Sequence, residues 1–136
     1  STKVKEIMFT DDNMPVVKAG SPVKDAIMEM DTKGIGATTV VDVEGRLLGI
    51  LTDGDLRRAL IKFGDIHSLK VEDVMTVSPK SIDEESSSAE ALGLMELYGI
   101  THLVVLDRDS RLKGVLHLHD LLGREDFKLN GGHAVA

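Results

Sequence analysis

The sequence has 136 residues, of which 42% are hydrophobic, 29% charged and 3% aromatic; it has no cysteine, and its formal net charge is -7 at pH 7. This length suits one compact domain or two small halves that share a core, and the lack of cysteine excludes disulfides and thiolate chemistry. The negative charge argues against nonspecific binding to nucleic acids or anionic membranes, because such binding needs lysine and arginine to displace counterions.

An internal repeat organises the chain. Segments that begin at Ala26 and Ala91 have similar apolar patterns 65 residues apart (91 − 26), and residues 4–8 resemble residues 71–75 at an offset of 67 (71 − 4). Further pairs at the 65-residue offset are Gly34-Ile35 with Gly99-Ile100, Val40-Val41-Asp42 with Val105-Leu106-Asp107, Gly49-Ile50-Leu51 with Gly114-Val115-Leu116, and Asp55-Leu56 with Asp120-Leu121. A repeat of this length indicates a duplicated supersecondary unit.

The first helix of the repeat is predicted from an apolar stripe. The residues with the i, i+3, i+4, i+7 spacing of one helix face are Val23, Ala26, Ile27 and Met30. Ser21-Pro22 has the pattern of an N-cap followed by a first helical residue, and Gly34 supplies a C-terminal stop. We therefore expect a helix that begins near Pro22 and ends at Gly34.

Two strands and a second helix follow. Residues 37–41 are β-branched and unbroken, as in a buried strand, and residues 47–51 form a second strand after a turn at Glu44-Gly45. A helix from Asp53 to Gly64 is predicted from a second apolar stripe. That stripe consists of Leu56, Ala59, Leu60 and Phe63. Each repeat is therefore predicted to run helix, strand, strand, helix.

The predicted fold class is α/β (α+β), with two such repeats related by a pseudo-twofold axis. A sheet of this size cannot bury both faces alone, so we expect the two halves to pack together with clefts between them. We place the first repeat at residues 1–66, the second at residues 67–124, and a mobile tail at residues 125–136.

The segment from Gly49 to Asp55 is the most informative for function, because a strand passes into a helix there. Thr52 followed three residues later by Asp55 is a capping-box pattern, in which each side chain bonds the other residue's backbone amide. The same geometry suits a ligand, since a helix N-terminus and the Thr52 hydroxyl favour phosphate and Asp55 would accept bonds from ribose. The spacing alone favours capping and leaves the ligand hypothesis open.

The second repeat keeps Asp120 but has His117 in the place of Thr52. Histidine donates to phosphate or carboxylate but is a poor substitute for a hydroxyl cap, so the two sites are expected to differ. On a continuing strand His117 and His119 would share one face, and His102 is a candidate to meet His117 in space. Metal sites usually need a third or fourth ligand at suitable spacing, so no metal is predicted.

Two arginines, Arg57 and Arg58, follow Asp55. Neighbouring residues on a helix point in different directions, so at most one of them faces a given site. An arginine here either clamps an anion or pairs with acidic residues in solvent. The sequence has no P-loop, no full G-x-G-x-x-G and no evident nucleophile motif, so catalysis by this chain is not expected.

Each repeat opens with a segment such as Val74-Met75-Thr76 and carries the motif Gly-h-h-(Thr)-x-x-Asp, in which h is an apolar residue and x is any residue. Repeats of this kind resemble paired cystathionine-β-synthase-type (CBS) domains, and the resemblance covers nearly the whole chain. The resemblance implies a module that binds adenosine nucleotides or related ligands, with the motif Asp on ribose and the motif Thr on phosphate. Together with Arg57, the predicted ligand-binding residues are Thr52, Asp55, Gly36, Ala37, Thr38, Thr101, His102, His117 and Asp120.

Residues 51–58 and 114–122 are similar to the C-terminal part of bacterial arabinose-5-phosphate isomerases. In that family a sugar-isomerase (SIS) domain precedes the CBS pair and interconverts ribulose 5-phosphate and arabinose 5-phosphate, which feeds synthesis of the lipopolysaccharide sugar Kdo. The resemblance implies a regulatory module that is not itself an enzyme and that senses a nucleotide or nucleotide-sugar. The candidate ligands are CMP-Kdo, AMP, ADP and ATP, and no cofactor is expected to be required.

The expected partners are a small nucleotide ligand, an attached isomerase domain and a second copy of the module in a homodimer. No apolar run approaches the roughly 20 residues of a membrane span and no signal peptide is evident, so we expect a cytoplasmic protein with neither a membrane nor a nucleic acid as partner. The alternative is a ligand-free structural or dimerisation module, in which Thr52 and Asp55 serve only as helix caps.

Overall fold

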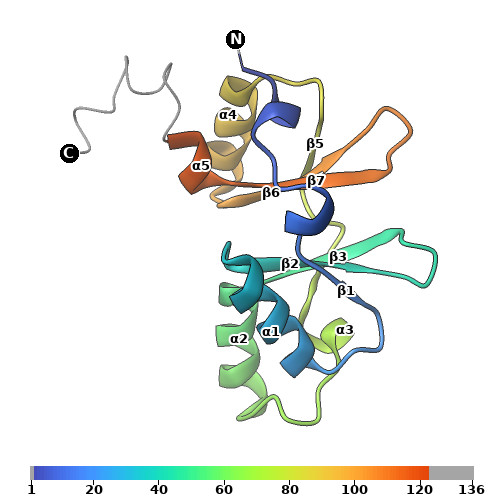
Figure 1. Ribbon diagram of the computed structural model, residues 1–136. Helices are drawn as coiled ribbons and strands as arrows, with labels where there is room; N and C mark the ends of the chain where they lie inside the picture. Colours follow the sequence, from blue (N-terminus) through green and yellow to red (C-terminus); the bar gives the residue numbers. More distant parts are fainter. Residues whose placement is uncertain (1, 123–136) are drawn as a thin grey trace. The chain divides into compact units, whose positions relative to one another are not determined.

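The computed structural model describes residues 2–122, which form two compact units (Figure 1). We call residues 12–79 the Thr52 unit, and residues 2–11 together with residues 80–122 the His117 unit. Neither unit coincides with one sequence repeat. The segment that opens each repeat is folded into the unit that contains the hairpin of the other repeat.

The Thr52 unit contains a four-stranded sheet in the order β1-β2-β3-β4, in which β1 is parallel to β2 and the other pairs are antiparallel. Its elements are β1 (Val16–Lys18), α1 (Val23–Lys33), β2 (Ala37–Val41), β3 (Leu47–Thr52), α2 (Asp53–Phe63), α3 (Val71–Val74) and β4 (Thr76–Val77). Figure 1 shows α1 and α2 on the same side of this sheet. Its core consists of Val17, Ala26, Met30, Val40, Leu51 and Val71.

The His117 unit contains a three-stranded sheet in the order β5-β6-β7, with β5 parallel to β6 and β6 antiparallel to β7. Its elements are a 3-10 turn at Val4–Glu6, β5 (Ser81–Asp83), α4 (Ser88–Tyr98), β6 (His102–Leu106), β7 (Leu112–His117) and α5 (Leu118–Leu122). A second 3-10 turn, Asp11–Asn13, lies where the chain passes to the other unit. Within residues 2–122, none of the helices combines the length and apolarity that a membrane span requires.

The predicted order of helix, strand, strand, helix is confirmed in both repeats. Gly34 ends α1 in the left-handed conformation at φ 77°, as expected for a glycine stop. The predicted start of α1 was wrong by one residue. Pro22 is the N-cap, and Ser21 lies before the helix. The backbone of this segment instead pairs with the start of the second repeat: Ser21 O accepts a hydrogen bond from Val71 N at 2.9 Å, and Pro22 forms an isolated β-bridge with Lys70.

The apolar stripes face the core only in part. In α1 the stripe is buried except for Ile27, but in α2 the Leu60 and Phe63 side chains are 47% and 46% exposed. Figure 1 shows α2 starting at the sheet and running away from it, so its last turn lies farther from the strands than its first turn. The second stripe therefore identifies a helix correctly but does not lie wholly in the core.

In each unit, a segment that belongs to the other sequence repeat pairs with the second strand of the hairpin next to a glycine. We call it the crossing segment, because it passes from one repeat into the unit that holds the hairpin of the other. In the Thr52 unit Ile50 pairs with Thr76, and in the His117 unit Val115 pairs with Phe9. A Cβ added at Gly49 would lie 2.6 Å from the Thr76 carbonyl oxygen, and one added at Gly114 would lie 2.7 Å from the Phe9 carbonyl oxygen. Both repeats therefore have a glycine before two apolar residues because the neighbouring backbone comes too close to leave room for a side chain.

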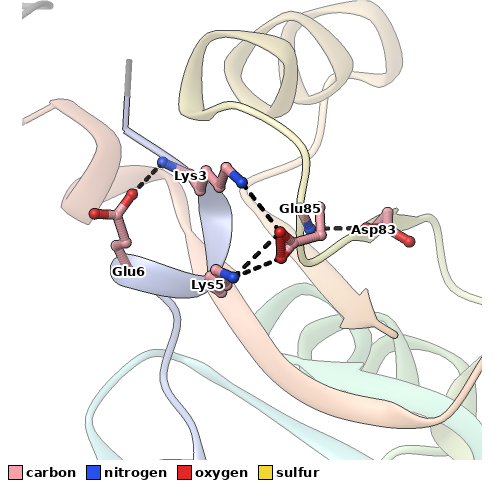
Figure 2. Close-up of polar contacts among 5 residues, drawn as sticks. All are labelled: Lys3, Lys5, Glu6, Asp83 and Glu85. Atoms are coloured by element: carbon pink, nitrogen blue, oxygen red, sulfur yellow. Dashed lines mark hydrogen bonds and ion pairs between the residues drawn. The ribbon is translucent and has the colours of Figure 1, made fainter. Parts of the chain in front are cut away.

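The N-terminal segment is also held to the loop that follows β5. Val4 N donates to Ser86 O at 2.8 Å, and the Val4 side chain is fully buried. Figure 2 shows Lys3 and Lys5 converging on the Glu85 carboxylate, with N···O distances of 3.1 and 2.6 Å. These ion pairs are about half exposed and therefore contribute little, so burial of Val4 is the stronger attachment.

We expect Gly114→Ala to lower the free energy of unfolding by about 1–3 kcal/mol, because the crossing segment would have to shift to admit a methyl group. Urea unfolding of the two proteins measures this difference. Gly93 in α4 is a matched control, since a Cβ there meets nothing within 4 Å and its φ is ordinary. Gly93→Ala should stabilise by about 0.4–1 kcal/mol, and equal effects at the two positions would contradict the crossing argument.

Candidate functional site

Strand β3 passes directly into helix α2 at Thr52. The Thr52 hydroxyl accepts a hydrogen bond from Asp55 N at 3.2 Å, and Asp55 Oδ2 accepts one from Thr52 N at 2.9 Å. The predicted capping box is therefore confirmed. It fixes the direction of the Asp55 side chain relative to the end of the strand.

The Asp55 side chain is only 6% exposed, yet its carboxylate is surrounded by donors. Oδ1 accepts hydrogen bonds from Arg58 Nη2 and from Thr76 Oγ1, each at 2.9 Å, and Oδ2 accepts a second bond from Thr52 Oγ1 at 3.0 Å. A buried carboxylate needs such partners, because an unpaired charge would be strongly disfavoured there. Thr76 was not predicted as a site residue, although it belongs to the Val-Met-Thr segment that opens the second repeat.

The start of β2, with Gly36 and Ala37, lies beside this corner. Ala37 pairs with Thr52, and Gly36 O accepts a hydrogen bond from Asp53 N at 3.1 Å. Gly36 has φ 71°, and a Cβ there would lie 2.9 Å from Asp53 Oδ2. Thr38 is fully buried, and its hydroxyl donates to the carbonyl oxygen of the next residue at 3.1 Å. Gly36 and Ala37 thus border the corner, whereas Thr38 lies inside the fold.

Among the described residues, the arginine that contacts Asp55 is Arg58, by an ion pair of 2.9 Å. The sequence left open which of the two arginines faces the site, and Arg57, which we named among the ligand-binding residues, is exposed on α2. Residues three apart lie on the same face of a helix, so the i, i+3 spacing of Asp55 and Arg58 was the signal that separates the two arginines.

The corresponding corner of the other unit is formed where β7 passes into α5. Leu118 N donates to Thr101 O at 2.8 Å, which repeats the bond from Asp53 to Gly36. His102 pairs with His117 across the strands, and the Thr101 hydroxyl lies 3.0 Å from His102 Nδ1. The predicted residues Thr101, His102 and His117 are therefore brought together.

Histidine rings dominate this second corner. The His102 and His117 rings stack with centroids 4.7 Å apart and an interplanar angle of 13°, and the His119 ring centroid lies 6.1 Å from that of His117. Asp120 Oδ2 lies 3.9 Å from His117 Nδ1. The strand ends at His117 and His119 lies on α5, so the two residues are not on one continuing strand. Residues 2–122 contain no group of three or more histidine, cysteine or carboxylate ligands placed to hold a metal ion.

Partial burial lowers the pKa of His117 below its ordinary value, while the Asp120 carboxylate opposes this shift and His119 adds to it. The neutral imidazole is therefore favoured in the folded protein. Neutral His117 has one donor and one acceptor nitrogen, unlike the Thr52 hydroxyl. The two corners share a backbone arrangement but present different chemistry.

Removal of the Thr52 cap should cost stability. We expect Thr52→Ala to lower the free energy of unfolding by about 1 kcal/mol, and Thr52→Ser to retain most of the wild-type value. Ser87, whose hydroxyl accepts from Glu90 N at 3.1 Å at the start of α4, is the matched cap in the other unit. Ser87→Ala should give a similar loss in urea unfolding, and a neutral Thr52→Ala would contradict the capping role.

The lowered pKa of His117 predicts a pH dependence of stability. Below about pH 6.5, the ordinary pKa, the unfolded chain binds a proton at this residue more readily than the folded chain does. The stability that neutral His117 contributes is therefore present above this pH and is lost as the pH falls. Urea midpoints at about pH 7.5 and 5.5 should differ less in His117→Asn than in the wild type. His67→Asn, in an exposed loop, should leave the wild-type difference intact, and an unchanged difference in His117→Asn would refute the assignment.

The CBS-domain family matches residues 4–62 and 71–125. The chain is 46% identical over 120 residues to the arabinose 5-phosphate isomerase KdsD of Pseudomonas aeruginosa, and 41% identical over 120 residues to that of Escherichia coli K12. Each match covers 88% of this chain, but only 37% and 36% of the two relatives. The chain thus spans little more than a third of the length of these curated proteins.

Solved CBS proteins have the same fold. The structure of CBSX2 in complex with AMP is 27% identical, with a TM-score of 0.76 over 96% of this chain and 99% of that one. The AMP complex of PAE2072 from Pyrobaculum aerophilum shares the fold at 18% identity, with a TM-score of 0.82 over 98% of this chain and 99% of that one. The two family matches together span most of the printed sequence, so this sequence is a pair of CBS domains. The chain therefore belongs to the CBS-domain family, as a tandem pair related to the CBS region of the KdsD isomerases.

Proposed function

We propose that this chain is the regulatory, ligand-binding CBS pair of an arabinose-5-phosphate isomerase, and that the corner at Thr52 binds a nucleotide or nucleotide-sugar. The observation that carries the proposal is the grouping of the Thr52 hydroxyl, the buried Asp55 carboxylate and the Arg58 guanidinium at one strand-to-helix corner. These groups supply an acceptor for ribose hydroxyls and donors for phosphate. The AMP bound by CBSX2, 27% identical to this chain, supports the nucleotide class.

CMP-Kdo is the ligand that we would test first. The KdsD relatives are arabinose 5-phosphate isomerases by name, and in that family arabinose 5-phosphate feeds Kdo synthesis, so an activated Kdo is a reasonable feedback signal. A CMP-sugar also offers both a ribose and a phosphate to the corner. We further propose that the attached isomerase domain is cytoplasmic and that the module is a homodimer. Regulation of that domain requires that the ligand bind one of two conformations of the protein more tightly than the other. AMP, ADP and ATP are the rival ligands.

A ligand-free structural or dimerisation module is the second candidate. The four hydrogen bonds to Asp55 come entirely from the protein, so capping alone accounts for its burial. The last turns of α2 also leave Leu60, Ile61 and Phe63 exposed, which offers apolar surface to another copy of the chain. Under this alternative no small molecule would stabilise the fold.

A thermal-shift screen against CMP-Kdo, CMP, AMP, ADP and ATP separates the two candidates. A ligand at 100 times its dissociation constant should stabilise the protein by about 2.7 kcal/mol, which corresponds to a rise in Tm on the order of 10 °C for a chain of this size. We expect CMP-Kdo to give the largest shift. A flat response to every ligand by a folded protein would favour the structural module.

Matched aspartate variants locate the site. Asp55→Asn should abolish the shift because an amide offers one acceptor oxygen where the carboxylate offers two, whereas Asp120→Asn, at the equivalent position of the other unit, should retain it. Each shift is measured from the variant's own Tm, so a lower starting stability does not obscure the result. A shift that survives Asp55→Asn and disappears in Asp120→Asn would move the ligand to the other corner.

A further inference from the structure

The Asp55 carboxylate has no vacant position for a ligand hydroxyl. A carboxylate has about four lone-pair sites, and four donors occupy them: Thr52 N and Thr52 Oγ1 on Oδ2, and Arg58 Nη2 and Thr76 Oγ1 on Oδ1. All four distances lie between 2.9 and 3.0 Å. A ribose that bonds Asp55 must therefore replace one of these donors.

The donor best placed to leave is Arg58. Both Thr52 bonds belong to the start of α2, so their loss would disturb the helix itself. Thr76 is held close by its backbone, which pairs with Ile50 in the sheet. Arg58 reaches Asp55 through a long side chain that is 62% exposed, so it can turn toward solvent without moving the backbone. Asp55 itself is only 6% exposed, so the incoming ribose hydroxyl has to take the place of the lost donor.

The position of the Arg58 guanidinium depends on Gly54. A Cβ at Gly54 would lie 3.2 and 3.3 Å from the two terminal nitrogens of Arg58, so the guanidinium lies over the backbone of the first turn of α2. The guanidinium therefore lies at the same corner as the Asp55 carboxylate that it contacts. Arg57, about 100° away around the helix, has the same charge and is also exposed, but its side chain has a different direction.

We propose that Arg58 is an exchangeable arm: it occupies Asp55 Oδ1 in the free protein and transfers to the anionic group of the ligand when a ribose hydroxyl takes its place. This inference rests on the proposed function of the Thr52 corner. It specifies the ligand class, because only a ribosyl compound that also carries phosphate or carboxylate gives Arg58 a new partner. A neutral nucleoside would displace the arginine from Asp55 without replacing its ion pair.

The sequence does not repeat this arm at the 65-residue offset. The residues that stand 65 positions after Thr52 and Arg58 are His117 and Gly123, and the counterpart of Thr76 in the crossing segment is Phe9. None of these replacements carries a guanidinium or a hydroxyl. The selection for an anionic ribosyl ligand therefore belongs to the Thr52 corner.

Isothermal titration of the wild type, Arg58→Gln and Arg57→Gln with CMP-Kdo, CMP, AMP, cytidine and adenosine tests the arm. In Arg58→Gln the affinity for the nucleotides should fall by about tenfold or more, as expected when hydrogen bonds to a charged group are lost. The affinity for the nucleosides should rise by about two- to fivefold, because the competing ion pair is gone. Arg57→Gln has the same change in net charge and should behave as the wild type.

The outcomes are distinguishable. If Arg58→Gln weakens nucleosides and nucleotides equally, or changes neither, the exchange is refuted while ligand binding at the corner stands. If Arg57→Gln reproduces the effect, the cause is net charge and not the arm. If the folded wild type binds none of the five compounds, the proposed function fails and this inference fails with it.

Discussion

The rest of the structure depends on one close backbone approach, made once in each unit. The crossing segment of one repeat lies directly against a glycine of the other repeat. A Cβ added at Gly49 would lie 2.6 Å from the Thr76 carbonyl oxygen, and one added at Gly114 would lie 2.7 Å from the Phe9 carbonyl oxygen. In the Thr52 unit this crossing also delivers Thr76, whose hydroxyl completes the hydrogen bonding of Asp55. Gly49, the glycine of the repeated motif, is therefore needed for packing, because a larger residue would push away the segment that carries Thr76.

Duplication has preserved the backbone of the corner more faithfully than its side chains. The bond from Asp53 N to Gly36 O recurs as the bond from Leu118 N to Thr101 O, so both units present a strand end and a helix start in the same way. One corner then holds a buried carboxylate, and the other holds two stacked imidazoles, of which His117 has a pKa lowered by partial burial. The two corners therefore share a backbone arrangement but differ in chemistry.

The features that the sequence predicts well are local ones. Apolar periodicity, caps and turn residues located the two helices and two strands of the repeated unit, because these signals depend on neighbours within a few residues. They did not reveal the short elements β1, α3, β4 and β5. A pattern shows which face is apolar but not what covers it, so the exposure of Leu60 and Phe63 was missed. The contact from Thr76 to Asp55 was missed for a related reason, since it joins residues brought together only by the crossing. Ser110 shows a further limit, because it adopts φ 63° at the turn position that Gly45 occupies at φ 83° in the first repeat.

Capping and ligand binding are rival explanations of Thr52 and Asp55 in the sequence, but under the proposed function they involve different oxygen atoms. Oδ2 is committed to the Thr52 amide and hydroxyl, which hold the start of α2. Oδ1 faces Thr76 and Arg58, which lie outside the capping box. A ligand that competes at Oδ1 leaves the helix start intact, so the cap does not have to break for the site to fill. The cap instead fixes the carboxylate in one orientation, and that orientation decides which donor a ligand must displace.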